Sequence, residues 1–163
     1  MKSFFVVIVI TAAFLLGCYS FTGGSVPEHL ATLNIATVED RSGFADPRYR
    51  DILTDELIKN FEDDGTFRLV ERNSDARLEA VITGIREEPI SVTQGELESE
   101  RKITISIDVE YTDLVKKKQV WKKVFSNYGV FEVANAQAGR QEALTTAVEQ
   151  SAEDILFAVV SGW

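Results

Sequence analysis

The most regular pattern of hydrophobic and polar positions lies in residues 102–112. Successive side chains of a strand point to opposite faces, so strict alternation predicts an antiparallel strand with one buried and one solvent-facing side. Residues 76–85 alternate in a similar way and predict a second long strand, partly buried on both faces and ending near Pro89. The apolar positions of the first pattern are Ile103, Ile105, Ile107, Val109 and Tyr111.

Three shorter segments also have the composition of strands, namely residues 30–38, 67–70 and 120–127. In the last of these, Trp121 and Phe125 fall on one face. Residues 128–133 continue it as an extended or bulged stretch. Polar residues 39–45 and 94–99 are expected to form connections without regular structure.

Two segments have the three-to-four residue spacing of amphipathic helices. The first begins at Asp46 and Pro47, which suit a cap and a first helical position, and ends near Gly65. The second is expected to begin at Arg140, after a loop of small residues over 134–139, and to end at Gly162. The apolar stripes are Tyr49, Ile52, Leu53, Leu57, Ile58 and Phe61 in the first helix, and Leu144, Val148, Ala152, Ile155, Leu156 and Val159 in the second.

The predicted order of elements is therefore β-α-β-β-β-β-α. Each amphipathic helix needs an apolar surface to cover its stripe, and one face of the sheet can serve both. We expect an α+β fold, a two-layer sandwich in which two amphipathic helices pack on one face of a four- to five-stranded, mostly antiparallel sheet. A single domain over residues 30–163 accounts for all of these elements.

The chain begins with a segment typical of a secretory signal peptide. Lys2 precedes an uncharged, mostly apolar run over residues 4–16, which is too short to span a bilayer at about 20 residues. The run ends in Leu15-Leu16-Gly17-Cys18, which resembles the bacterial lipobox that is cut before its cysteine. Residues 1–17 are therefore expected to be a lipoprotein signal peptide, and Cys18 to carry acyl chains. An ordinary buried or free thiol is the alternative.

Residues 18–29 are expected to be the lipidated cysteine and a short polar tether. The lipobox resemblance implies a domain anchored to a membrane through the acyl chains on Cys18. Tyr19 stands where an aspartate would retain a lipoprotein at the inner membrane, so the outer membrane is favoured. His29, the single histidine, is expected to be solvated in this tether.

Composition excludes several classes of protein. The one cysteine cannot form an intrachain disulfide, and one histidine excludes a His-based metal cluster. The formal net charge of −9 argues against nucleic-acid binding. No phosphate-binding loop, nucleophile elbow or zinc motif is present, and the paired carboxylates fall at loop or helix ends. We therefore expect a protein without catalytic residues, bound metal or cofactor.

Basic side chains provide the candidate contacts for an anionic lipid. Lys116, Lys117 and Lys118 are consecutive at a predicted hairpin turn, and Lys102 and Lys122 lie on strands, together with Arg101, near that turn. The alternatives are a solvated turn for the three lysines and cross-strand pairs with Asp108 and Glu110 for the strand residues.

The pattern as a whole resembles the LptE family of lipopolysaccharide-assembly lipoproteins. The likeness rests on the lipobox and on three later segments spread over the chain. These are residues 38–43 (Val-Glu-Asp-Arg-Ser-Gly), 75–82 (Asp-Ala-Arg-Leu-Glu-Ala-Val-Ile) and 125–131 (Phe-Ser-Asn-Tyr-Gly-Val-Phe).

The resemblance implies an outer-membrane lipoprotein whose domain lies on the periplasmic side. Such a protein plugs the β-barrel translocon LptD, assists assembly of the barrel and binds lipopolysaccharide. The alternative is an outer-membrane lipoprotein that regulates a periplasmic envelope enzyme, such as a peptidoglycan synthase.

Overall fold

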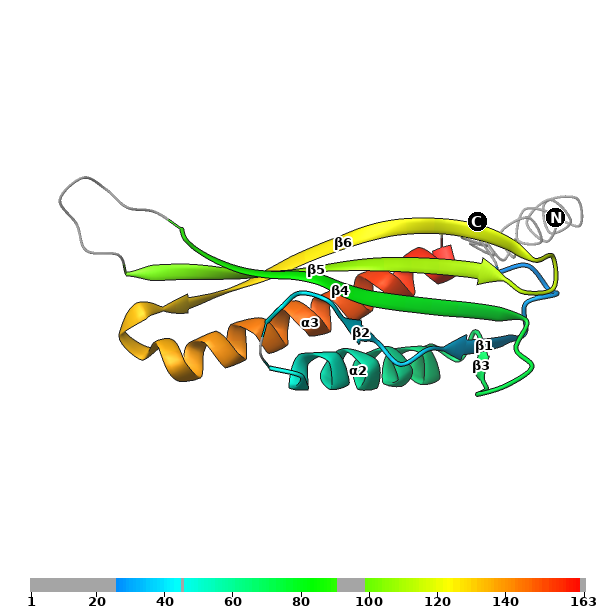
Figure 1. The fold of residues 1–163 in the computed structure, drawn as a ribbon. Coiled ribbons are helices and arrows are strands. Elements are labelled where there is room, and N and C mark those ends of the chain that lie inside the picture. Colours follow the sequence, from blue (N-terminus) through cyan, green and yellow to red (C-terminus); the bar gives the residue numbers. More distant parts are fainter. Residues whose placement is uncertain (1–25, 45, 91–98, 162–163) are drawn as a thin grey trace, which may run out of the picture.

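The computed structural model describes residues 26–44, 46–90 and 99–161 (Figure 1). The signal peptide, Cys18, most of the tether, residues 94–98 of the polar connection and Gly162 lie outside these residues. The strands are β1 (Thr32–Ile35), β2 (Glu39–Asp40), β3 (Arg68–Leu69), β4 (Ala76–Pro89), β5 (Glu100–Asp113) and β6 (Lys118–Glu132). The helices are α2 (Arg48–Asp64), the 3-10 helix η2 (Val133–Asn135) and α3 (Ala136–Ser161).

The strands form one sheet in the order β3-β1-β4-β5-β6, and β2 also pairs with β4. The long strands β4, β5 and β6 form an antiparallel meander, whereas β1 and β2 run parallel to β4. The predicted α+β class and the mostly antiparallel sheet are confirmed, but the predicted count of four to five strands was too low. Residues 39–40, expected in a loop, form β2 because they align with Val81 and Ile82 of β4.

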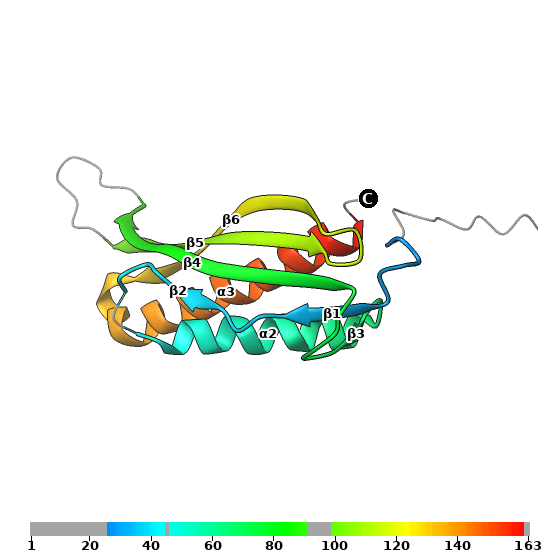
Figure 2. The ribbon, with the colours of Figure 1, turned by 45° about the vertical axis from the view of Figure 1, so that its right-hand side comes forward.

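Both helices cover the same face of the sheet, as predicted (Figure 2). We call this the inner face and the other the outer face. The apolar positions of β5 point inward, and Ile103, Ile105, Ile107, Val109 and Tyr111 are completely buried. At β4 the register shifts between Ile82 and Gly84, so Ile85 joins the inner face despite an odd spacing from Ile82.

Helix α2 follows its prediction closely. Tyr49, Leu53, Leu57 and Phe61 are its buried residues, and Gly65 ends the helix with a left-handed φ of 70°. The helix begins at Arg48, one residue after Pro47, and the Arg48 N–H donates to Asp46 Oδ1 at 3.1 Å. Asp46 therefore does accept a hydrogen bond at the start of the helix.

Helix α3 begins at Ala136, four residues before the predicted Arg140. The small residues over 134–139, expected in a loop, form η2 and the first turn of α3. Of these residues, Gly139 packs closely against β6, because a Cβ added to it would lie 2.9 Å from Phe131 Cβ. Strand β6 is continuous to Glu132, and its irregularity lies near its start, where Val120 has no partner in the register with β5.

Candidate functional site

Two of the predicted lipid-contact residues are paired with carboxylates on the outer face. Lys102 Nζ lies 3.0 Å from Glu88 Oε1 on β4, and Lys122 Nζ lies 3.8 Å from Glu110 Oε2 across the β5–β6 ladder. The cross-strand alternative is therefore confirmed for Lys122. Exposed pairs of this kind contribute little to stability, typically below about 1 kcal/mol.

The five predicted lysines do not form one patch. Lys102 pairs with the far end of β4, eleven residues along β5 from Asp113, where the hairpin turn begins. At ~3.3 Å per residue, that separation is about 36 Å. The expectation that Arg101 and Lys102 lie near the turn was therefore wrong, because both residues stand at the start of β5 and the turn follows its end.

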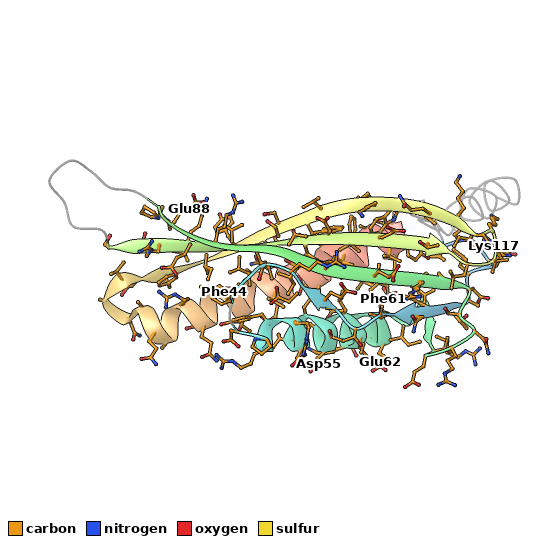
Figure 3. The ribbon with its side chains drawn as sticks, in the orientation of Figure 1. Phe44, Asp55, Phe61, Glu62, Glu88 and Lys117 are labelled. Atoms are coloured by element: carbon orange, nitrogen blue, oxygen red, sulfur yellow. The ribbon has the colours of Figure 1, made fainter. Side chains whose placement is uncertain are left out.

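The remaining three lysines are exposed where β5 turns into β6, and Lys118 is the first residue of β6. Figure 3 labels Lys117 at this end of the sheet. None of Lys116, Lys117 and Lys118 has an ion pair within the described part of the chain. Two apolar side chains of the same turn, Leu114 and Val115, are also exposed. We call residues 114–118 the basic turn.

A buried carboxylate fastens the basic turn to the start of the domain. Asp113 Oδ2 lies 2.7 Å from His29 Nε2, and Asp113 Oδ1 accepts the Lys116 N–H at 2.7 Å. Burial raises the pKa of Asp113, but the hydrogen bonds from His29 and Lys116 outweigh it, so the pKa lies below its usual value. The expectation of a solvated His29 was wrong, because its side chain is held by a residue 84 positions away.

Asp75 reinforces the same end of the domain. Its Oδ2 accepts hydrogen bonds from the N–H groups of Ala31 and Thr32 and from the Thr32 hydroxyl at 2.7–3.1 Å. The hydroxyl bond lowers the pKa of Asp75, with the N–H donors adding to it. The backbone carbonyl of Asp75 accepts the Leu114 N–H at 2.8 Å, so β1, β4 and the basic turn are joined.

A second charged cluster lies at the opposite end of the sheet. Glu87 Oε1 forms an ion pair with Arg101 Nε at 2.9 Å, and Glu87 Oε2 accepts a hydrogen bond from Arg140 Nε of α3 at 2.7 Å. The Arg140 guanidinium also lies over the Phe131 ring, 5.6 Å from its centroid. The register shift in β4 turns Glu87 inward, so this carboxylate, expected to be solvated, joins β4, β5 and α3.

An open groove of about 500 Å³ lies on the outer face, between β4 and the connection from β1 to β2. Several of its charged side chains form ion pairs, with N–O distances of 2.6 Å for Arg41 and Glu39 and 3.0 Å for Arg77 and Glu79. Within the described ranges, no group of three or more His, Cys, Asp or Glu side chains could hold a metal ion. No helix there has the length and apolar composition needed to cross a membrane.

Three solved structures share this fold at low sequence identity. The hypothetical protein CT253 from Chlamydia trachomatis has a TM-score of 0.61 and 8% identity, covering 79% of this chain and 95% of its own. A minor lipoprotein from Acinetobacter baumannii has a TM-score of 0.55 and 11% identity, covering 80% of this chain and 92% of its own. Rare lipoprotein B from Shewanella oneidensis has a TM-score of 0.53 and 11% identity, covering 77% of this chain and 92% of its own. At these identities the likeness establishes the fold alone.

No curated protein matches the sequence. The family model for LptE, described as lipopolysaccharide-assembly, matches residues 30–159. This range begins two residues before β1 and ends in the last turn of α3, and it includes Asp75, Asp113 and Glu87 but not His29. The chain therefore belongs to the LptE family of lipopolysaccharide-assembly lipoproteins.

Proposed function

We propose that this protein is an outer-membrane component of the lipopolysaccharide transport machinery, acting as a non-catalytic plug and assembly partner of an LptD-type β-barrel. The family match over residues 30–159, directly after a lipobox and tether, is the observation that carries the proposal. Acyl chains on Cys18 would hold the domain on the periplasmic side of the membrane. Lipopolysaccharide is the cargo that the family assignment supports.

The outer face of β6 is the surface best suited to a protein partner. Val124, Tyr128 and Val130 are exposed there, and Val124 retains 67% of its accessible surface. Alternation places these three side chains on the face that no helix covers. A row of exposed apolar side chains on a long edge strand is typical of a surface that another protein covers.

Affinity purification of the acylated protein from outer membranes tests the proposal. We expect a large β-barrel to be recovered with it, and the double variant Val124→Asp, Val130→Asp to recover much less. Phe157→Asp is the matched control, because Phe157 is 70% exposed but lies on α3. Absence of any barrel would contradict the proposal, and binding to a soluble synthase ectodomain instead would support an envelope-enzyme regulator.

A further inference from the structure

The basic turn lies at the end of the domain where the chain enters it. His29 and Asp113 are in direct contact, so the first described residues lie against the turn. Cys18 is eight residues before Val26, and at ~3.3–3.6 Å per residue this length reaches at most about 29 Å. Strand β5 alone is about 46 Å long at ~3.3 Å per residue. A lipid anchor on Cys18 therefore places this end of the domain closest to the membrane.

The side chains of the basic turn match the chemistry of a phospholipid surface. Lys116, Lys117 and Lys118 offer three exposed ammonium groups, and Leu114 and Val115 offer exposed apolar surface between them and the sheet. Two carboxylates beside the turn, Asp75 and Asp113, accept hydrogen bonds from the N-terminal segment and the turn backbone. Lysines attract anionic headgroups, and short apolar side chains enter the interfacial region.

The backbone conformation at Lys117 is unusual for a lysine. Its φ is 52°, in the left-handed region that glycine and asparagine adopt more readily. Asn73, the other non-glycine residue with a positive φ among those described, follows that preference. A lysine at this position keeps a charge at the tip of the turn where asparagine would fit the backbone better.

From these observations we infer that the basic turn is a second membrane contact, which lies on anionic phospholipids beside the lipid anchor. The inference rests on the proposed anchor at Cys18. The acyl chains on Cys18 supply the attachment, and the basic turn adds a second contact at the level of the headgroups. The contact also fixes which end of the domain faces the phospholipid headgroups.

A fluorescent label at position 115 tests this directly on the acylated protein. Because acylation consumes the single native cysteine, Val115→Cys supplies the one free thiol for an environment-sensitive dye. On vesicles of phosphatidylcholine and phosphatidylglycerol we expect a blue-shifted emission and several-fold weaker quenching by acrylamide. Val124→Cys is the control position, since Val124 is exposed on the outer face of β6. Equal quenching at both positions would overturn the inference.

Two sets of charge variants distinguish an effect of the basic turn from an effect of the net charge of the protein. Replacing Lys116, Lys117 and Lys118 by Gln should restore acrylamide quenching of the dye at position 115. Each lost lysine should lower the affinity of the turn for the anionic surface by about fivefold. Replacing Lys59, Arg86 and Lys102 by Gln removes the same charge elsewhere and should leave the protection unchanged. An equal loss in both variants, or protection that requires added lipopolysaccharide, would overturn the assignment to phospholipid. Circular dichroism confirms folding of each variant.

The same preparation distinguishes failure of this inference from failure of the proposed function. Mass spectrometry reports whether Cys18 carries acyl chains, and co-purification reports the barrel. The lysine-to-glutamine variant of the basic turn should still recover the barrel, because the turn and the outer face of β6 are different surfaces. A recovered barrel with an unprotected label would overturn the membrane contact alone.

Discussion

Substituting Gly129 by alanine tests the packing of α3 on β6. Gly129 lies in β6 on the inner face, and a Cβ built on it would fall 2.1 Å from the carbonyl oxygen of Ala143. The carbonyl carbon and Cα of Ala143 would lie at 2.5 and 2.6 Å. All three atoms belong to the helix backbone, so no side-chain rotation can relieve the clash.

The expected loss of stability follows from the distance that the helix must move. Ordinary contact requires about 3.4 Å or more, so α3 would retreat by more than ~1 Å from the strand. Leu144 and Val148, which are completely buried on the same helix, would lose contacts in the process. Overpacking typically lowers the free energy of unfolding by about 1–3 kcal/mol. Because no side-chain rotation moves the Ala143 backbone aside, we expect Gly129→Ala to lower it by ~3 kcal/mol. For a domain of this size, that lowers Tm by roughly 10 °C.

Thermal and urea unfolding followed by circular dichroism measure this effect. Gly84→Ala is the matched control, because Gly84 also lies in a long strand, has no positive φ, and has no atom within 4 Å of an added Cβ. We expect Gly84→Ala to change Tm by little. Equal stability of the two variants would refute the direct approach of α3 to β6 at Gly129.

Three further predictions concern the anchor and the basic turn. Cys18→Ala should release the protein from the membrane fraction, and unchanged fractionation would refute acylation. Asp113→Asn should lower the free energy of unfolding by about 1–3 kcal/mol at neutral pH, because it replaces a buried charged acceptor. The pKa of Asp113 is lowered, so its contribution is complete above the unfolded pKa of ~3.9 and is lost as pH falls through the native pKa. In urea titrations the difference between wild type and variant should therefore vanish in acid, and a pH-independent difference would contradict this assignment. Lys117→Asn should raise stability by up to about 1 kcal/mol, since asparagine adopts a φ of 52° more readily, and an unchanged or lower Tm would count against strain there.

The elements that the sequence predicts well are those whose signal is local. The alternation of β5 and the stripe of α2 follow from side-chain geometry within one element, and both were confirmed. Strand β2 could not be predicted in the same way, because residues 39–40 have no strand pattern and pair only through the register of β4. The early start of α3 was missed because small residues suit a loop and a tightly packed helix equally well.

The charged sites also differ in how far a local sequence pattern predicts them. Lys122 and Glu110 carry opposite charges on adjacent strands of one hairpin, which the sequence pattern contains, although their exact register includes the irregularity at Val120. The contacts of Glu87 with Arg101 and Arg140 depend on a register shift that no local pattern marks. The contact between His29 and Asp113 joins the predicted tether to a turn 84 residues later in the chain. The composition of the tether does not predict this contact.

The net charge of −9 does not oppose a membrane contact at the basic turn, because the shape of the domain separates the charges. At physiological ionic strength, electrostatic interactions between exposed groups are screened over about 8 Å. Asp55 and Glu62 on α2 and Glu88 at the far end are set back from Lys117 along the long axis (Figure 3). Glu88 is further neutralised by Lys102. An anionic surface at the turn therefore interacts with the three exposed lysines, and the acidic residues farther along the domain are screened from it.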